Sequence, residues 1–114
     1  IEELDRELAA ALAAGKPAML DFYADWCVSC KEMEKYTFSV PAVQQDLAGY
    51  VLLKADVTAN NEADQALLRR FGVYGPPTTA FFGAHGRECR AFRLVGYVAA
   101  DDFRAHLSRF TREC

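Results

Sequence analysis

Two cysteines, Cys27 and Cys30, are separated by two residues within the stretch Trp26-Cys27-Val28-Ser29-Cys30. Thiols at this spacing can meet at the first turn of a helix, where they can close into a disulfide and reopen. Exchange needs a thiolate nucleophile, and a free thiol has a pKa of about 8.5. The unpaired N–H groups and the dipole of a helix N-terminus favour the thiolate, so we predict that Cys27 attacks. Cys30, one turn further in and less exposed, then attacks the mixed disulfide and releases the partner.

The same pair is also compatible with a structural disulfide or with half of a metal site. His85 and Cys89 form an H-x3-C pair, which together with Cys27 and Cys30 superficially supplies four zinc ligands. The spacing places His85 on a hairpin turn, away from the strand end that carries Cys27. We therefore expect no metal, and no cofactor other than the Cys27–Cys30 disulfide itself.

Cys89 and Cys114 stand apart from that motif. A last strand of roughly seven residues and a last helix of roughly thirteen would both measure about 20 Å. If the helix runs back along the strand, its end returns to the start of the strand. A second disulfide between Cys89 and Cys114 is then possible, the alternative being two unpaired thiols. Alpha carbons more than about 7 Å apart would exclude it.

Two carboxylates are placed to influence the thiols. Asp21 interrupts an apolar strand, where an unpaired carboxylate is costly, and Glu34 shares the helical face of the cysteines two turns inward. Both are expected to approach the thiols from behind, where their negative charge would raise the pKa of Cys27 against the effect of the helix. They would also carry the proton when Cys30 becomes a thiolate. In the alternative, Asp21 is a satisfied polar group of the core and Glu34 an exposed helix residue.

The surrounding sequence predicts the elements that position these residues. Hydrophobic periodicity indicates helices over residues 1–14, from 27 onward, from 41 to about 48, 61–71, and from 101 or 102 onward. Runs of strand-forming residues indicate strands over 17–24, 50–57, 78–82 and 90–97. A helical crossover makes the first two strands parallel and a hairpin makes the last two antiparallel. We therefore expect an α/β fold with a mixed sheet of about four strands and helices on both faces.

Local signals set the helix boundaries. Ser39 followed by Pro41 is typical of an N-cap and a first-turn proline, and Asn60 or Asn61 can cap the next helix. That helix is expected to bury one stripe of side chains, formed by Ala63, Leu67, Leu68 and Phe71.

Composition bounds the class of protein. The 114 residues, 52% of them hydrophobic, are the size of a single domain spanning residues 1–114. With 13 basic against 16 acidic residues, a net charge of −3 and no basic stripe, nucleic acid is not an expected partner. No apolar run approaches the roughly 20 residues of a membrane span, so insertion of this segment into a membrane is not expected. The start at Ile1 rather than Met suggests a fragment from which a targeting segment or anchor was removed.

The flanks of the cysteine motif carry a family resemblance. A strand that ends in Trp-Cys-x-x-Cys at a helix start, with Pro77-Thr78 opening a later strand, resembles the thioredoxin superfamily. Residues 19–38, 51–61 and 75–78 narrow the resemblance to the C-terminal periplasmic domain of the DsbD family of transmembrane thiol:disulfide interchange proteins. The resemblance implies a thioredoxin fold for nearly the whole chain. The short strand that commonly leads this fold has no counterpart before Ile1, which again suggests trimming.

In that family the residue matching Pro77 forms a cis peptide bond beside the cysteines and shapes a docking groove for partners. The residue before it pairs its backbone with an incoming strand, but here this position is Pro76, which has no N–H to donate. We therefore expect partner binding to rely, besides the loop at Gly75, on three aromatic side chains, those of Trp26, Tyr23 and Tyr74. Each of these rings is also compatible with ordinary packing.

The implied activity is that of a protein-disulfide reductase in the periplasm, tethered to the inner membrane and serving cytochrome c biogenesis. The resemblance implies that electrons pass from a membrane-embedded domain of the same polypeptide to an N-terminal periplasmic domain. A monomer is expected. Two alternatives stay open: a free-standing thioredoxin-like reductase, and a non-catalytic thioredoxin-fold binding module whose cysteines are structural.

Overall fold

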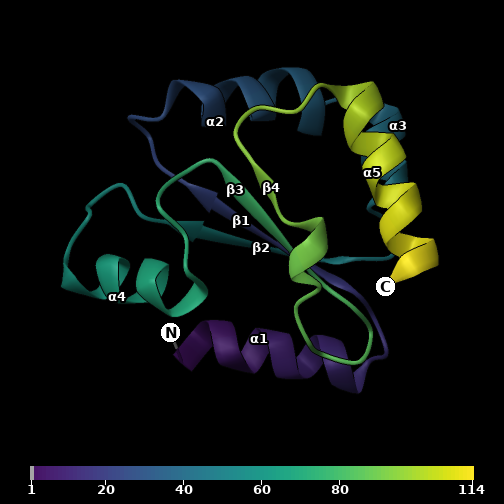
Figure 1. The fold of residues 1–114 in the computed structure, drawn as a ribbon, viewed down its shortest axis with the longest axis horizontal. Coiled ribbons are helices and arrows are strands. Elements are labelled where there is room, and N and C mark those ends of the chain that lie inside the picture. Colours follow the sequence, from purple (N-terminus) through teal and green to yellow (C-terminus); the bar gives the residue numbers. More distant parts are fainter. Residues whose placement is uncertain (1) are drawn as a thin grey trace.

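The computed structural model describes residues 2–114, which form a four-stranded sheet covered by helices (Figure 1). The strands lie in the order β2-β1-β3-β4, with bounds β1 Ala18–Tyr23, β2 Val51–Asp56, β3 Thr78–Phe82 and β4 Leu94–Val95. β1 pairs parallel with β2 and antiparallel with β3, and β3 pairs antiparallel with β4. The predicted mixed sheet of four strands is confirmed.

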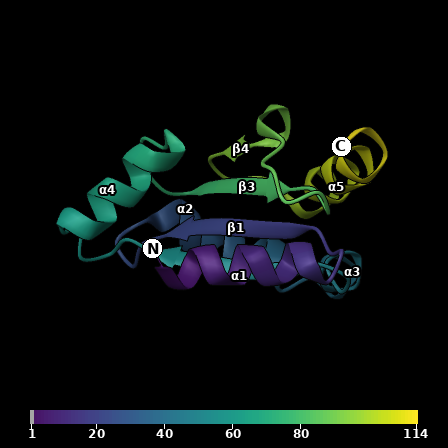
Figure 2. The same cartoon turned by 90° about the horizontal axis from the view of Figure 1, so that it is seen from below.

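Helices cover both faces of this sheet. Figure 1 shows α2, α3 and α5 on one side of the sheet and α1 and α4 on the other, and Figure 2 shows α1 running alongside β1. Two short segments, η1 and η2, are a π-helix and a 3-10 helix. The bounds are α1 Glu2–Ala13, α2 Val28–Met33, η1 Glu34–Phe38, α3 Pro41–Asp46, α4 Glu62–Phe71, η2 Arg90–Phe92 and α5 Ala100–Glu113.

Alternation along β1 divides its side chains between two cores. Leu20 and Phe22 pack in a cluster that includes residues of α1 and α4. Met19 packs in a second cluster with residues of α2, α3 and α5. Because successive strand side chains point to opposite faces, Asp21 lies on the Met19 side, under the layer that carries the cysteines.

The fourth strand is shorter than the predicted span 90–97. Only Leu94–Val95 pairs with β3. The 3-10 turn Arg90–Phe92 precedes it, and Gly96, with a positive φ of 87°, follows it. In the 3-10 turn, backbone N–H groups bond to carbonyls three residues earlier; the N–H of Arg93, for example, donates to the carbonyl of Arg90 at 3.1 Å. Because this stretch is bonded within itself, it does not extend the pairing of β4 with β3.

Two predicted helix starts are corrected. Val40, not Ser39, occupies the N-cap position of α3, because the Ser39 hydroxyl donates back to the Lys35 carbonyl in the preceding helix. The first-turn position of Pro41 is confirmed. The last helix begins at Ala100, ahead of the predicted aspartates.

The start of α4 is capped by Asn61, whose Oδ1 accepts the backbone N–H of Asp64 at 2.9 Å, as predicted. Ala63 is exposed rather than buried, because it lies in the first turn of α4, the part that Figure 1 shows furthest from the sheet. The remaining members of the predicted stripe pack against the core: Leu67, Leu68 and Phe71.

The helix after Cys27 is regular only as far as Met33 and continues as η1. Met33 and Thr37 are buried, whereas Tyr36 is 52% exposed. The Thr37 hydroxyl donates to the Val98 carbonyl at 2.6 Å and so ties this helix to the segment that leads into α5.

Candidate active site

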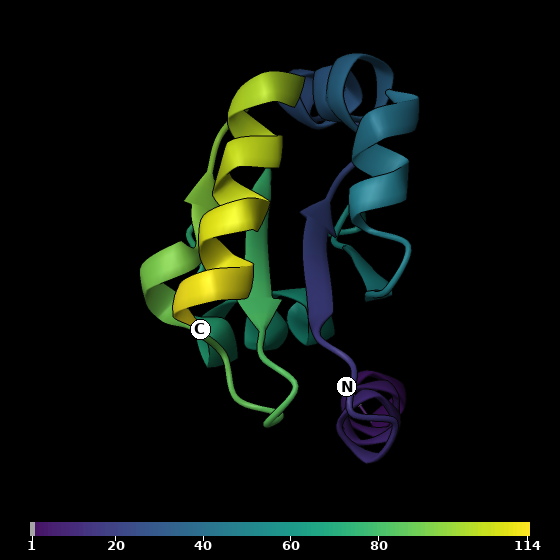
Figure 3. The ribbon, with the colours of Figure 1, turned by 90° about the vertical axis from the view of Figure 1, so that its right-hand side faces the viewer.

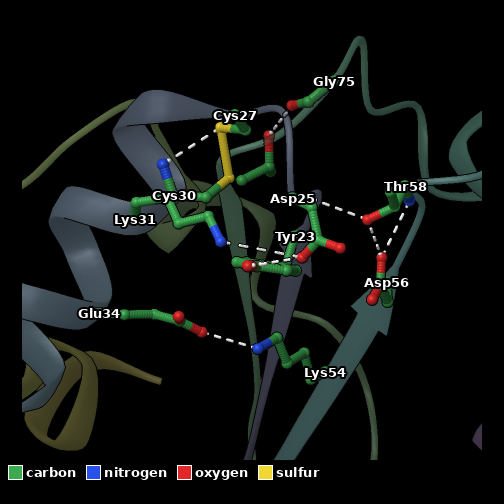
Figure 4. Close-up of a disulfide and its surroundings, with 11 residues drawn as sticks. Tyr23, Asp25, Cys27, Cys30, Lys31, Glu34, Lys54, Asp56, Thr58 and Gly75 are labelled. Carbon is green, nitrogen blue, oxygen red and sulfur yellow. Dashed lines mark hydrogen bonds and ion pairs between the residues drawn. A yellow bond between two sulfur atoms is a disulfide. The ribbon is translucent and has the colours of Figure 1, made fainter.

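The strand β1 delivers the cysteine motif to the start of α2, as predicted. Cys27 is the N-cap residue of α2, and its Sγ accepts the backbone N–H of Cys30 at 3.1 Å. The two cysteines form a disulfide with alpha carbons 5.2 Å apart (Figure 4). A sulfur at an N-cap faces unpaired N–H groups and the positive end of the helix, so this site favours a thiolate on Cys27.

Both sulfurs belong to the interior. Cys27 is 7% exposed and Cys30 is 3% exposed, within a small cluster that contains Tyr23, Ala24 and Val57. Cys30 is the less exposed of the two cysteines, as predicted. A partner sulfur must nevertheless approach closely, because little of either cysteine reaches the surface.

The loop before Cys27 is anchored by Thr58, which lies just after β2. The Trp26 indole N–H donates to the Thr58 carbonyl at 3.0 Å, and the Asp25 backbone N–H donates to the Thr58 hydroxyl at 2.8 Å. Thr58 is itself fixed by Asp56, whose Oδ1 accepts the Thr58 backbone N–H at 2.9 Å. These bonds fix residues 25 and 26, just before Cys27, to the turn that follows β2.

Sequence reasoning did not identify Thr58 or Asp56. An Asp followed two residues later by Thr at a strand end is a signal for a local side-chain-to-backbone turn. That signal predicts the bond between Asp56 and Thr58. It does not reveal that the turn faces the cysteine loop, because this contact depends on the β1–β2 pairing.

Tyr23 does not lie on the surface expected for partner binding. It is only 5% exposed, and its hydroxyl donates to Asp25 Oδ1 at 2.9 Å. Its ring lies under the Lys54 ammonium, 3.8 Å from Nζ to the ring centroid. Because β1 buries this ring beside the cysteines, Tyr23 positions the charges around the motif and does not itself offer a contact face.

Asp21 lies directly opposite Lys54 in the β1–β2 register and opposite Thr79 in the β1–β3 register. Burial raises the pKa of the Asp21 carboxyl to about 6, the positive charge of Lys54 lowers it, and the negative charge of Glu34 raises it. Asp21 is thus a carboxyl that gains and loses its proton close to neutral pH.

Glu34 is held by Lys54. The Lys54 Nζ donates to Glu34 Oε2 at 2.7 Å, and this hydrogen bond raises the pKa of Lys54 (Figure 4). Both side chains remain roughly half exposed, so the pair lies at the edge of the site. Sequence reasoning did not identify Lys54, which contacts Glu34 and Tyr23 and lies across from Asp21. The available signal was the alternation of side chains between the two faces of β2.

The loop after α4 lies beside the cysteines. The Pro76–Pro77 peptide bond is cis, as the family resemblance implied. Figure 4 shows Gly75 of this loop next to Cys27, and the Gly75 carbonyl accepts the Thr78 hydroxyl at 2.8 Å. Three residues next to Cys27 or Gly75 in the sequence have exposed apolar side chains: Trp26 (59%), Val28 (73%) and Tyr74 (107%).

The second disulfide that the sequence left possible is present between Cys89 and Cys114, with alpha carbons 6.5 Å apart. Figure 3 shows the C-terminus of α5 returning to the segment that follows β3. The predicted seven-residue strand does not make this contact; Cys89 lies in the turn before η2. His85 lies beside these two cysteines, so the four residues considered as a zinc set are divided between two places.

Within residues 2–114, none of the helices combines the length and apolar character needed to cross a membrane.

Comparison with known proteins places these features in a family. A family model described as a thioredoxin-like domain matches residues 4–111. The chain is 58% identical over 107 residues to the thiol:disulfide interchange protein DsbD of Cronobacter sakazakii, and 53% identical over 109 residues to that of Ralstonia nicotianae. These alignments cover 94% and 96% of this chain but only 18% of each relative.

Solved structures give the same assignment. The C-terminal domain of Neisseria meningitidis DsbD in its reduced form matches with a TM-score of 0.79 and 38% identity, covering 95% of this chain and 94% of that one. Its oxidised form matches with a TM-score of 0.79 and 37% identity, covering 99% and 95%. The chain therefore belongs to the thioredoxin-like domain family, and within it to the C-terminal domains of DsbD proteins.

Proposed function

We propose that this chain is a thiol:disulfide oxidoreductase domain that exchanges the Cys27–Cys30 disulfide with dithiols and disulfides of protein partners. The observation that carries the proposal is the position of Cys27 Sγ at the start of α2, where it accepts the N–H of Cys30 at 3.1 Å. Hydrogen bonds to a charged acceptor are stronger than those between neutral groups, so this contact favours the thiolate that exchange requires.

The exchange proceeds through two sulfur transfers. In the reduced domain, the Cys27 thiolate attacks one sulfur of a partner disulfide, and the electron pair of the broken bond goes to the partner's other sulfur. Cys30 then attacks the Cys27 sulfur of the mixed disulfide. This step re-forms the Cys27–Cys30 bond and releases the partner as a dithiol that has gained two electrons and two protons.

Asp21 takes the proton that Cys30 loses in the second step. It lies on the face of the sheet that α2 covers, and a carboxyl with a pKa of about 6 is suited to proton transfer near neutral pH. Its negative charge also opposes a thiolate in the same low-dielectric region, which holds the thiol back until a partner docks.

Glu34 has a different role from the one expected from the sequence. Its carboxylate pairs with the Lys54 ammonium, whose positive charge lies across from Asp21. Glu34 is therefore a positioning residue that acts through Lys54, and Asp21 is the proton carrier.

The docking surface consists of the exposed side chains of Trp26, Val28 and Tyr74 and the loop from Gly75 to Pro77. Pro76 offers an incoming strand no N–H, so side-chain contacts supply more of the binding free energy. Aromatic side chains are suited to this because they bury large areas and lose little rotamer freedom.

The family assignment supports a more specific proposal about partners. The DsbD relatives are far longer than this chain, so residues 1–114 are proposed as one domain of a longer, membrane-tethered protein. The domain would act in the periplasm as a monomer and relay electrons from a membrane-embedded domain to an N-terminal periplasmic domain, in cytochrome c biogenesis.

A trapping experiment tests the exchange proposal. The reduced Cys30→Ala variant, mixed with a disulfide-containing partner domain, is expected to accumulate a mixed disulfide through Cys27, because the resolving thiol is gone. The Cys27→Ala variant, which keeps Cys30, is the matched control and should accumulate far less. Absence of an adduct at Cys27 would favour the alternative, a non-catalytic binding module.

A competition between partners separates the relay from a free-standing reductase. The reduced domain should transfer electrons to the oxidised N-terminal domain of a DsbD relative much faster than to an unrelated folded protein that carries an exposed disulfide. Equal rates with both would favour the free-standing reductase and contradict the relay.

A further inference from the structure

Three side chains that the exchange mechanism does not use converge at the far end of the sheet. His85 Nε2 lies 3.9 Å from Cys89 Sγ and 3.8 Å from Cys114 Sγ. The end of β3 lies opposite the start of β1, at Phe82 and Ala18, whereas Cys27 follows the end of β1. The two disulfides therefore lie at opposite ends of the sheet and cannot exchange with each other directly.

The His85 ring is held in one position. Its Nδ1 accepts the backbone N–H of Arg87 at 3.1 Å. A β-carbon placed on Gly83 would lie 2.5 Å from His85 Nε2, so the absence of a side chain at Gly83 lets the ring fold back against the chain. The turn from Gly83 to Arg87 therefore fixes the direction of the ring toward the two sulfurs.

The contact at Nδ1 assigns the proton on the other ring nitrogen. A nitrogen that accepts an N–H carries no hydrogen, so the neutral ring has its hydrogen on Nε2, the atom that faces both sulfurs. A histidine that binds a metal through one nitrogen normally donates a hydrogen bond from the other. Here the other nitrogen accepts one. The arrangement thus favours a hydrogen-bond donor to sulfur over a His85, Cys89 and Cys114 metal site, although the ligand atoms lie within 4.8 Å of one another.

The two cysteine residues differ in exposure. Cys114 and His85 are exposed, whereas Cys89 is half-buried. Cys114 also lines a pocket of about 350 Å³ whose walls are largely apolar and include Tyr50, Ala84 and Phe110. An attacking sulfur can therefore reach Cys114 from this side, and Cys89 is then the sulfur that leaves.

We propose that Cys89–Cys114 is a second thiol–disulfide exchange site, open to small thiols and dithiols, in which His85 donates a hydrogen bond to the departing Cys89 sulfur. An incoming thiolate forms a bond to Cys114 Sγ, the Cys89–Cys114 bond breaks, and its electron pair goes to Cys89, which leaves as a thiolate facing the Nε2–H. With a dithiol, the second thiol attacks the mixed disulfide and releases Cys114. The dithiol is oxidised to a disulfide, the two cysteines are reduced, and the two protons pass to them through solvent.

Reduction rates test this proposal in a background that silences the first site. In the Cys27→Ser/Cys30→Ser protein, reduction of Cys89–Cys114 by dithiothreitol is followed by alkylation and mass spectrometry. The His85→Ala variant should be reduced about tenfold more slowly, the scale of one hydrogen bond to a charged group. His85→Gln keeps an N–H donor and should recover part of the rate. Arg112→Ala, which removes an exposed charge two residues from Cys114, should change the rate by less than about twofold. Equal rates for the parent protein and His85→Ala would overturn the role of His85.

A monothiol tests the direction of attack. Glutathione is expected to form its mixed disulfide on Cys114, and an adduct mapped to Cys89 would overturn the assignment of the leaving sulfur. No adduct and no reduction by millimolar thiol in the folded protein would overturn the exchange site and leave a purely structural disulfide. Stoichiometric binding of Zn²⁺ by the reduced protein, lost in His85→Ala, would instead identify a metal site. Because the Cys27–Cys30 pair is absent, none of these outcomes depends on the proposed function.

Discussion

The Lys54 ammonium donates to the Glu34 carboxylate at 2.7 Å while lying directly across the β1–β2 ladder from Asp21. One positive charge is thus shared between two carboxylates on the side of the sheet that α2 covers. Glu34 is the closer partner and is partly solvated, whereas Asp21 is more buried and only feels the charge at a distance. The site therefore contains one partly exposed carboxylate held in an ion pair and one buried carboxyl that titrates near neutral pH.

This arrangement predicts that Lys54→Met raises the pKa of Asp21 above its value of about 6. The positive charge of Lys54 lowers this pKa, and its loss leaves burial and the charge of Glu34 to act unopposed. Titration of the Asp21 carboxyl carbon by NMR measures the change. Lys35→Met, which removes an exposed ammonium that lies over the ring of Tyr36, is the matched control and should leave the titration unchanged. An Asp21 pKa that falls in Lys54→Met would contradict the assigned coupling.

Asp21→Asn should stabilise the folded domain at alkaline pH and have little effect at acid pH. The folded state raises the pKa of this acid from 3.8 to about 6, so the wild type loses stability as the pH rises through that interval, where the unfolded chain ionises first. Below about pH 3 the carboxyl is protonated in both states and the substitution is nearly neutral. Above pH 7 the variant should gain about 3 kcal/mol in free energy of unfolding, the equivalent of that shift in pKa.

Urea unfolding of the oxidised proteins at several pH values checks this difference. Subtracting the wild-type curve from that of Asp21→Asn cancels the titration of all other groups. Asp25→Asn, which removes an exposed carboxylate in the turn that follows β1, is the comparison variant. A difference that stays constant from pH 4 to pH 8 would show that burial of Asp21 does not impose the proposed cost.

The same substitution should slow the release of a partner. Asp21 is proposed to accept the proton of Cys30, and loss of a positioned base reduces the rate by roughly a hundredfold in typical cases, less where water can replace it. We expect resolution of a preformed mixed disulfide on Cys27 to slow about tenfold in Asp21→Asn at pH 7, measured by stopped-flow release of a fluorescent thiol. Glu34→Gln should slow it much less, because Glu34 is held by Lys54. Equal effects of the two substitutions would return Glu34 to the role of proton carrier.

The sheet and the paired cysteines could be predicted from the sequence because their signals lie within short stretches of the chain. Apolar runs mark β1 and β3, and the spacing of Cys27 and Cys30 fits one helical turn. The register between strands is not local. The contacts of Lys54 with Glu34 and of Trp26 with Thr58 join residues far apart in the chain and follow only from the pairing of β1 with β2.

Burial of an aromatic residue was equally hard to predict from sequence. Tyr23 and Trp26 both flank the motif, yet Tyr23 ends a strand and is covered, whereas Trp26 lies in the following turn and is exposed. The fourth strand shows the complementary error. The apolar pattern of residues 90–97 fits a strand, but the 3-10 turn Arg90–Phe92 removes its first half from the ladder.

Thr58→Val should loosen the loop that carries Trp26 without disturbing the fold. The substitution removes the hydroxyl that accepts the Asp25 N–H, at a cost of about 1 kcal/mol for one partly solvated hydrogen bond. We expect faster hydrogen exchange at the Asp25 amide and a small loss of stability. Thr58→Ser keeps the hydroxyl and is the matched control. Unchanged protection of the Asp25 amide in Thr58→Val would show that Thr58 does not anchor the loop.

Tyr74→Ser should weaken recognition of protein partners while leaving the chemistry of Cys27 intact. The Tyr74 side chain is fully exposed beside the cis-proline loop and makes no hydrogen bond from its hydroxyl within residues 2–114, so its removal should cost the fold little. Truncating one interface aromatic commonly costs more than about 1 kcal/mol, which predicts an increase of about tenfold in KM for a protein disulfide. The rate with a small aromatic disulfide should stay within about twofold, because that substrate does not reach the docking surface. Leu12→Ser, at an exposed apolar position near the end of α1, controls for loss of surface hydrophobicity and should alter neither value. A parallel loss with both substrates would place the effect of Tyr74 on the cysteines themselves and remove it from the docking surface.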